Sequence, residues 1–366
     1  MSPNVDTGCE ALRRASIDLI TGLQAPSGAF PACPTFAVYR YSWLRDGTYI
    51  AVALDTVGRS AEASAFHDWV GRVIDRMSPA IDAVVAMRAA GRIPEQGDLL
   101  PTRYTLEGAV EEPSDDEWPT VQLDGYGVWI WGLREHLGGA LCPQHLRAAV
   151  RAVADYLVAT WDLACYDCWE EFGDRRHTST LGAIAAGLAA AGDLVDEEAY
   201  RQASATVVSW VRDHCVVDGS LVKGPQDDRV DGSLLTLAVP LRVFDPDEPL
   251  MKTTVRRIQD EIVSPGGGVW RYRGDTYFGG GAWLLLTCWL GLYEAELGRL
   301  DDARRRLAWA VSHADAELRL PEQVVSDAQV PSMVQPWVTK WGTPASPLLW
   351  SHAMYLLLDD AIRRNS

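Results

Sequence analysis

Residues 180–194 read TLGAIAAGLAAAGDL, with apolar residues at the three- and four-residue spacing that is typical of a helix. The same period recurs in segments bounded by Gly, Pro, Asp or Ser, at residues 11–23, 48–57, 61–77, 125–137, 145–160, 198–211, 232–241, 250–262, 282–297, 301–318 and 347–362. Strand-like alternation is scarce and confined to short pieces such as residues 269–272. About twelve helices joined as hairpins predict an all-α fold in which six helix pairs form a toroid.

The composition is that of a globular chain with a large core. Of the 366 residues, 48% are hydrophobic, which excludes a disordered chain. The 33 basic and 50 acidic side chains leave a net charge of −17, which makes nucleic acids and anionic membranes poor partners. The chain has 15 Trp and only 6 Phe. Trp offers a broad apolar face and an N–H donor, which suits a sugar-binding cleft, although any single Trp could equally fill the core.

Neither a secretory signal nor a membrane span is expected. The first nine residues contain no basic n-region and no apolar h-region, which predicts a cytoplasmic protein. The most apolar stretch, residues 279–293, is about 15 residues long and ends at Glu294, short of the roughly 20 needed to cross a bilayer. Seven Cys at irregular spacing indicate reduced thiols. Cys165 and Cys168 have no companion ligand pair at metal spacing, so we expect two buried small residues and no metal or other cofactor.

Five segments between the helices combine Trp or Tyr with charged or amide side chains, which are poor core material because each ionised group would need a buried partner. We interpret them as one site built from many loops. The first two segments contribute the candidates Tyr39, Trp43, Arg45, Asp46, Trp118, Gln122 and Asp124. An Arg beside an Asp can hydrogen-bond the hydroxyls of one sugar while a ring covers its C–H groups. Asp46 and Asp124 could alternatively serve only as helix caps.

The third segment places two adjacent carboxylates beside a ring, in Asp167, Trp169, Glu170 and Glu171. Like charges packed together raise one pKa, as a general acid near neutrality requires, although two exposed Glu in a loop would look the same. The fourth segment, residues 271–283, contains Arg271, Trp283 and three consecutive glycines that do not follow the register of a phosphate loop. The fifth places Glu322 on a turn, ahead of Trp337 and Trp341.

Separate carboxylates among aromatic rings are what glycoside hydrolysis requires, since one acid protonates the leaving oxygen and a base or nucleophile acts at the anomeric carbon. We therefore pair Glu170 or Glu171 with Glu322. Sequence spacing does not give the distance between the carboxyl groups, so these residues alone leave retaining and inverting outcomes open.

Taken in this order, the five segments resemble glycoside hydrolase family 15, the glucoamylase family, from Tyr39 to His352. The resemblance implies an (α/α)6 barrel that releases β-glucose from non-reducing ends with inversion. It assigns Glu170 as the general acid and Glu322 as the general base. It also implies sugar-binding roles for Tyr39, Trp43, Arg45, Asp46, Trp118, Gln122, Asp124, Asp167, Trp169, Glu171, Arg271 and Trp283. Because Arg45 and Glu322 must reach one pocket, we expect a single catalytic domain over residues 1–366 rather than the two domains that length alone suggests.

Departures from the family pattern bear on the substrate. Only 38 residues precede Tyr39 and 14 follow His352, so we expect neither an N-terminal β-sandwich domain nor a carbohydrate-binding module. Leu123 replaces polar residues that fungal enzymes carry in the second motif. A small oligosaccharide, α-1,6-linked as in isomaltose, is the expected substrate and partner, and the sequence does not indicate an oligomeric state. An α-1,4-specific or maltose-type enzyme and a trehalase stay open.

Two other classes of protein could use a similar helical toroid, namely an inactive sugar-binding protein and an enzyme that catalyses a different reaction. A sugar-binding barrel without activity would lack a catalytic carboxylate, yet Glu170 and Glu322 are both present. Phosphorolysis or elimination on a similar toroid is the other, and residues 320–330 contain no Lys or Arg for a phosphate site.

Overall fold

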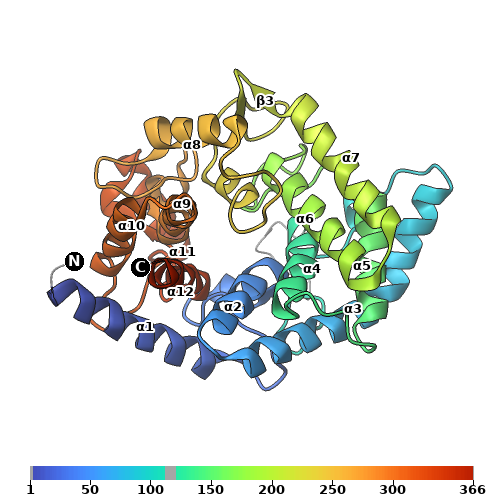
Figure 1. Ribbon diagram of the computed structural model, residues 1–366, viewed down its shortest axis with the longest axis horizontal. Helices are drawn as coiled ribbons and strands as arrows, with labels where there is room; N and C mark the ends of the chain where they lie inside the picture. Colours follow the sequence, from blue (N-terminus) through green and yellow to red (C-terminus); the bar gives the residue numbers. More distant parts are fainter. Residues whose placement is uncertain (1–2, 112–120, 366) are drawn as a thin grey trace.

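The computed structural model describes residues 3–111 and 121–365, in which two concentric sets of helical elements form a ring (Figure 1). The inner elements are α2 (Leu44–Thr56), α4 (Asp124–His136), α6 (Thr178–Val195), the 3₁₀ helix η3 (Gly232–Leu237), α9 (Leu284–Glu296) and α12 (Leu349–Arg364). The outer elements are α1 (Pro3–Leu23), α3 (Ser60–Ala89), α5 (Arg147–Thr160), α7 (Glu198–His214), α8 (Pro249–Ile262) and α10 (Leu300–Ser312). The all-α toroid of six pairs is therefore confirmed.

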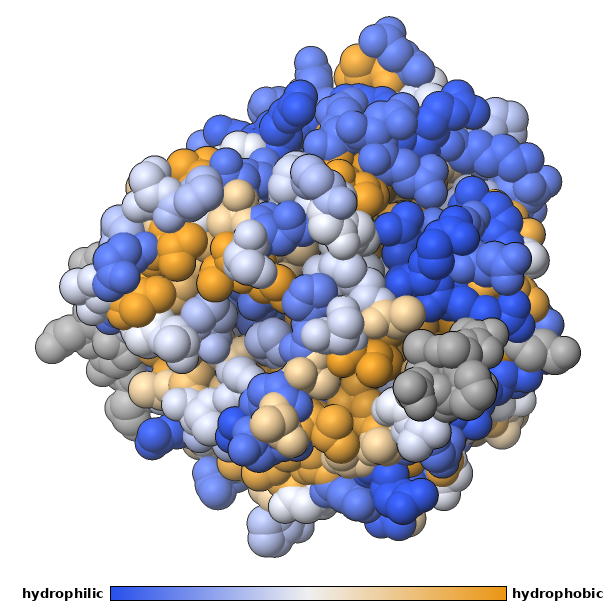
Figure 2. All heavy atoms as spheres, turned by 90° about the vertical axis from the view of Figure 1, so that its left-hand side faces the viewer, coloured by the Kyte–Doolittle hydropathy of each residue, from blue (hydrophilic) through white to orange (hydrophobic). Residues whose placement is uncertain are grey.

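The inner elements pack in sequence order, and the ring closes where α12 packs against α2. Each outer helix lies against the ring, for example α3 on α2, α7 on α6, α10 on α9 and α1 on α12. Figure 2 views the side of the ring that carries α1, α8 and α10, and hydrophilic residues cover much of it between separate hydrophobic patches. This is the surface expected of outer helices that bury only one face.

The inner and outer helices differ in how much of their surface is buried. In α6, 15 of 18 residues are buried, whereas α7 buries only Tyr200, Ser204, Val207 and Val211. By length and composition α6 is apolar enough to cross a membrane, but 83% of it is buried inside the fold, as in the core helix of a water-soluble domain. The backbones of α4 and α6 touch, because a Cβ on Gly187 would lie 2.5 Å from Cα of Gly127.

Two differences from the expected helices matter for the site. Residues 232–241 were expected to form a helix, but only the 3₁₀ helix η3 forms there, capped by Asp231, whose side chain accepts the Ser233 N–H. All six residues of η3 are buried. The apolar period therefore predicted a buried element correctly, but the α-helix expected there was wrong. The helix α11 (Val334–Trp341) was not expected and has no buried residue.

Short antiparallel pairs bring distant segments to one end of the ring. The strand β1 (Ser42–Trp43) pairs with β2 (Arg103–Tyr104), and β5 (Ala282–Trp283) pairs with β6 (Gln323–Val324). A third pair, β3 (Val216–Val217) with β4 (Ser220–Leu221), closes a hairpin after α7. Since β1 leads directly into α2 and β5 directly into α9, both strands lie at the N-terminal ends of inner helices. The candidate side chains of residues 39–46 and 271–283 therefore lie at the same end of the ring.

Candidate active site

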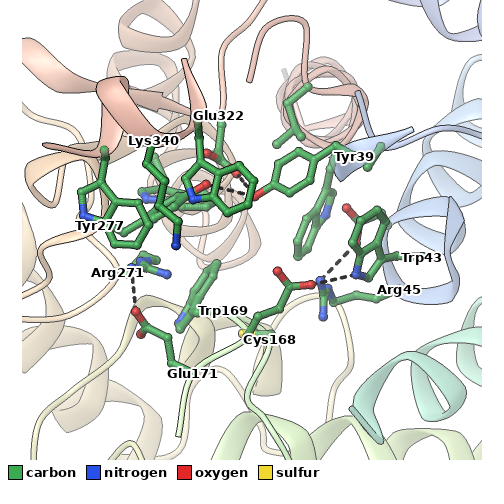
Figure 3. A pocket seen from close by; sticks show the side chains of 18 residues that line it. Tyr39, Trp43, Arg45, Cys168, Trp169, Glu171, Arg271, Tyr277, Glu322 and Lys340 are labelled. Atoms are coloured by element: carbon green, nitrogen blue, oxygen red, sulfur yellow. Dashed lines mark hydrogen bonds and ion pairs between the residues drawn. The ribbon is translucent and has the colours of Figure 1, made fainter. Parts of the chain in front are cut away.

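A cavity of about 220 Å³ lies at this end of the ring, and most of the predicted site residues line it (Figure 3). Ten of them do so, namely Tyr39, Trp43, Arg45, Asp46, Trp169, Glu170, Glu171, Arg271, Trp283 and Glu322. They come from four of the five segments, all but the second, and only the folded ring places them around one space. Trp118 lies outside the described residues.

Three predicted binding residues do not line the cavity but lie directly behind its wall. Arg45 donates from Nη1 to Gln122 Oε1 at 2.7 Å and to Asp124 Oδ2 at 3.0 Å. All three side chains are buried, so Gln122 and Asp124 fix the direction of the guanidinium. Asp167 lies in the same way beneath the turn that carries Glu170.

Arg45 and Asp46 form an ion pair at the floor of the cavity, with Nη2 of Arg45 3.2 Å from Oδ2 of Asp46. Burial raises the pKa of Asp46 to about 6, although the adjacent Arg45 favours its charged form. The pair supplies both donors and acceptors to the cavity, which matches the hydroxyl groups of a sugar.

Glu170 sits on a tight turn whose backbone is held from beneath. Its φ of 66° is in the left-handed region, which is uncommon for a residue with a side chain. Asp167 Oδ1 accepts the backbone N–H groups of Trp169 and Glu171, the residues before and after Glu170, each at 2.9 Å, and so holds the turn in place. The carboxylate of Glu170 accepts a hydrogen bond from Nε1 of Trp43 at 2.9 Å and is partly exposed to the cavity.

A buried charge network supports this turn. Nζ of Lys223 lies 2.7 Å from Oδ2 of Asp167 and 2.5 Å from Oδ2 of Asp231. Asp231 also accepts Nε1–H of Trp169 at 3.0 Å. Burial alone would raise the pKa of Asp167, but the Lys223 ammonium outweighs it and holds the pKa below the usual value. Lys223 was not predicted, because a single Lys in a connecting segment gives no signal in the sequence.

Glu322 has a different environment, ahead of β6. It is only 2% exposed, and its Oε1 accepts the hydroxyl of Tyr39 at 2.9 Å. Its Oε2 is buried and has no hydrogen-bond partner among residues 3–111 and 121–365. Burial raises the pKa of Glu322 to about 7, against the Tyr39 hydrogen bond and the Arg271 charge, which both lower it. A carboxyl group of this kind can exchange a proton near neutral pH.

Glu171 and Arg271 form another part of the wall. Nη2 of Arg271 lies 3.2 Å from Oε1 of Glu171, and Tyr272 donates its hydroxyl to Oε2 of the same carboxylate. Asp275 accepts hydrogen bonds from Nε of Arg271 at 2.7 Å and from the same Nη2 at 2.5 Å. Arg271 also lies 5.5 Å from the ring centre of Trp283, which orients that ring toward the cavity.

Several lining residues were not predicted as site residues. They include Tyr277, Cys168, Trp350, Trp337, Lys340 and Trp341. The three Trp residues within residues 337–350 could have been predicted as site residues, because they lie close together in the sequence. Nothing in the sequence indicated Cys168 or Lys340. The hydroxyl groups of Tyr277 and Tyr39 lie 3.2 Å apart, which links Tyr277 to the pair formed by Tyr39 and Glu322.

The cysteines do not form a separate site. Cys165 and Cys168 are both free and buried, as expected. Among the residues that the structure describes, no group of three His, Cys, Asp or Glu side chains is placed to hold a metal ion.

Comparison with known sequences extends over nearly the whole chain. The family described as Glycosyl hydrolases family 15 matches residues 9–358. The isomaltose glucohydrolase of Kribbella flavida is 41% identical over 359 residues, which cover 96% of this chain and 92% of that protein. The trehalase of Mycolicibacterium smegmatis is 26% identical over 80% of this chain, which spans only 48% of the trehalase.

Solved structures agree in fold. A wild-type glycosidase that is 40% identical superposes with a TM-score of 0.93 and covers 99% of each chain. A bacterial glucoamylase complexed with acarbose, 19% identical, gives a TM-score of 0.75 over 99% of this chain and 57% of its own. The second likeness concerns the fold alone, which is the expected (α/α)6 barrel. With its two carboxylates in one ring-lined cavity and this match along its length, the chain belongs to glycosyl hydrolase family 15 and is a glycoside hydrolase.

Proposed function

We propose that this enzyme removes glucose from the non-reducing end of short α-glucosides with inversion, and that its preferred substrate is α-1,6-linked isomaltose. The observation that carries the proposal is the placement of Glu170 and Glu322 around one cavity, in two contrasting environments. Glu170 is partly exposed beside Trp43, whereas Glu322 is buried with one free oxygen. Two carboxyl groups that differ in this way can divide the acid and base roles.

In the proposed reaction, Oε2 of Glu322 accepts a proton from a water molecule, whose oxygen attacks the anomeric carbon. The bond from that carbon to the glycosidic oxygen breaks as Glu170 gives its proton to the leaving oxygen. One glycosidic bond and one O–H bond of water are replaced by two hydroxyl groups, and the attack from the opposite face gives β-glucose. Arg45 and Asp46 would hold the hydroxyls of the first sugar, and Glu171 with Arg271 would face the second.

The linkage is supported by 41% sequence identity over 92% of the length of an isomaltose glucohydrolase. A trehalase is the second candidate, because several trehalases are about 26% identical to this chain, although it spans only about half of each. An α-1,4-specific enzyme is a third, since a clostridial glucoamylase is 23% identical. Initial rates on isomaltose, trehalose and maltose at equal concentration decide among them, and a higher rate on trehalose or maltose would overturn the α-1,6 assignment.

The two roles can be separated with α-glucosyl fluoride, whose leaving group needs no protonation. We expect Glu170→Gln to lower kcat on isomaltose about 10³-fold but kcat on the fluoride only slightly, whereas Glu322→Gln lowers both about 10³-fold. Equal losses in the two variants on both substrates would contradict the assignment. Proton NMR of the first sugar released from the fluoride tests inversion, and initial α-glucose would contradict it.

A further inference from the structure

Helix α11 stands apart from the ring of helices. It is eight residues long, has no buried residue, and packs chiefly on the 3₁₀ helices η4 (Tyr277–Gly279) and η6 (Pro331–Met333). A helix this short gains little from its own hydrogen bonds, so packing must hold it in place. Yet three of its side chains, Trp337, Lys340 and Trp341, line the cavity that contains both catalytic candidates.

Two glycines of the run at residues 279–281 make room for this segment. A Cβ on Gly279, whose φ is 78°, would lie 2.7 Å from Cγ2 of Val334 and 2.9 Å from the carbonyl oxygen of Val330. The N–H of Val330 donates to the carbonyl of Gly279 at 2.9 Å, and that of Gln329 donates to the carbonyl of Gly280 at 3.2 Å. The glycine run, which serves no phosphate loop, is thus the seat on which the α11 segment docks.

The inner face of α11 has the chemistry of a sugar contact. The ring of Trp337 packs edge-on against Tyr277 at 5.0 Å, and its Nε1 is shielded and has no partner among the described residues. The Lys340 ammonium lies 5.8 Å from the ring of Trp337 and 4.9 Å from that of Trp341. Lys340 lines the cavity, and its ammonium points into it in Figure 3. Ring faces suit the C–H groups of a sugar, and an ammonium offers three donors to its hydroxyls.

The position of α11 indicates which sugar it would contact. Figure 3 places Lys340 and Tyr277 across the cavity from Trp43 and Arg45, the side proposed to hold the first sugar. We propose that α11 forms the wall of the site for the leaving sugar and limits the substrate to two sugar units. This inference rests on the proposed function. In this arrangement Lys340 holds a hydroxyl of the leaving sugar, and Trp341 blocks the path of a third.

The test compares variants of the full-length enzyme on isomaltose, isomaltotriose and α-glucosyl fluoride, which has no leaving sugar. We expect Lys340→Met to lower kcat/KM about tenfold or more on isomaltose, the loss of a charged hydrogen bond, and at most threefold on the fluoride. Trp341→Ala should raise the ratio of isomaltotriose to isomaltose kcat/KM at least tenfold. Lys252→Met is the matched control, since Lys252 lies on α8 and pairs with Asp247 away from the cavity.

The outcomes separate this proposal from the proposed function. Equal losses on isomaltose and fluoride in Lys340→Met, or an unchanged ratio in Trp341→Ala, would overturn the role of α11 while wild-type turnover of the fluoride still supports the catalytic pair. Failure of the wild-type enzyme to hydrolyse the fluoride would overturn the proposed function itself. Circular dichroism and thermal unfolding of each variant show whether a loss reflects unfolding, and Gly279→Ala, which displaces α11 from its seat, must then shift the same ratio.

Discussion

The two carboxylates differ in how the protein holds them. Glu170 lies on a strained turn that is fixed from beneath by the charged groups of Asp167 and Lys223. Glu322 forms no ion pair among the described residues. Burial and one hydrogen bond from the Tyr39 hydroxyl mainly determine its pKa. The comparison teaches that buried charges can fix the position of one carboxylate while desolvation sets the proton affinity of the other. Each of these effects can be removed by a separate substitution.

Removing Lys223 should have the largest effect on this comparison. Lys223→Met leaves Asp167 and Asp231 buried without their cation, which typically costs about 3–5 kcal/mol. We expect a lower free energy of unfolding and, where the variant folds, a kcat that falls much more than KM rises. Urea unfolding and steady-state kinetics measure both.

A double variant shows whether the charge itself is responsible. Lys223→Met combined with Asp231→Asn removes a cation and an anion together, and it should recover part of the lost stability. A kcat that stays at the wild-type value in Lys223→Met would show that the network does not position Glu170.

Glu322→Gln should make the protein more stable while it inactivates the enzyme. In the folded state the pKa of Glu322 is about 7, against an ordinary value of 4.5, so the folded protein binds this proton more tightly than the unfolded chain. The charge therefore destabilises the fold increasingly as pH rises from about 4.5 to 7, by up to about 3 kcal/mol above pH 7.

The increase in the free energy of unfolding of Glu322→Gln over the wild type should reach its full value above pH 7 and vanish near pH 4.5. Chemical unfolding of both proteins at pH 4.5, 6 and 8 gives the difference at each pH. A gain that is the same at all three values would contradict the role of ionisation.

The smallest effect is expected at the hydrogen bond between Tyr39 and Glu322. This bond favours the charged carboxylate, so Tyr39→Phe should raise the pKa of Glu322 further. If Glu322 is the base, kcat/KM of the wild-type enzyme declines as pH falls through about 7, and the decline should begin at a higher pH in the variant. Tyr49→Phe is a suitable control, because Tyr49 is buried beside Trp350 and makes no contact with Glu322. An unchanged acid limb in Tyr39→Phe would exclude Tyr39 as a determinant of that pKa.

The sequence predicted most inner and outer helices because one-sided burial imposes a period that can be read locally, as in α7 with its buried residues Tyr200, Ser204, Val207 and Val211. It failed at η3, where burial is complete but only a short 3₁₀ turn fits, and at α11, which has no buried face and hence no apolar period. The candidate residues came from motifs, yet the contacts that hold them did not. Lys223, 53 residues from Glu170, gave no signal, and Tyr39 was predicted for the site but not as the partner of Glu322, 283 residues away.

The closure of the ring between α12 and α2 also has a consequence for how activity arises. Tyr39, beside the first inner helix, and Glu322, ahead of the last, meet only after every intervening element has found its place. A refolding chain should therefore regain helical signal well before its first turnover, because local helices form without the ring. Enzyme activity in this protein reports the completion of folding rather than its progress.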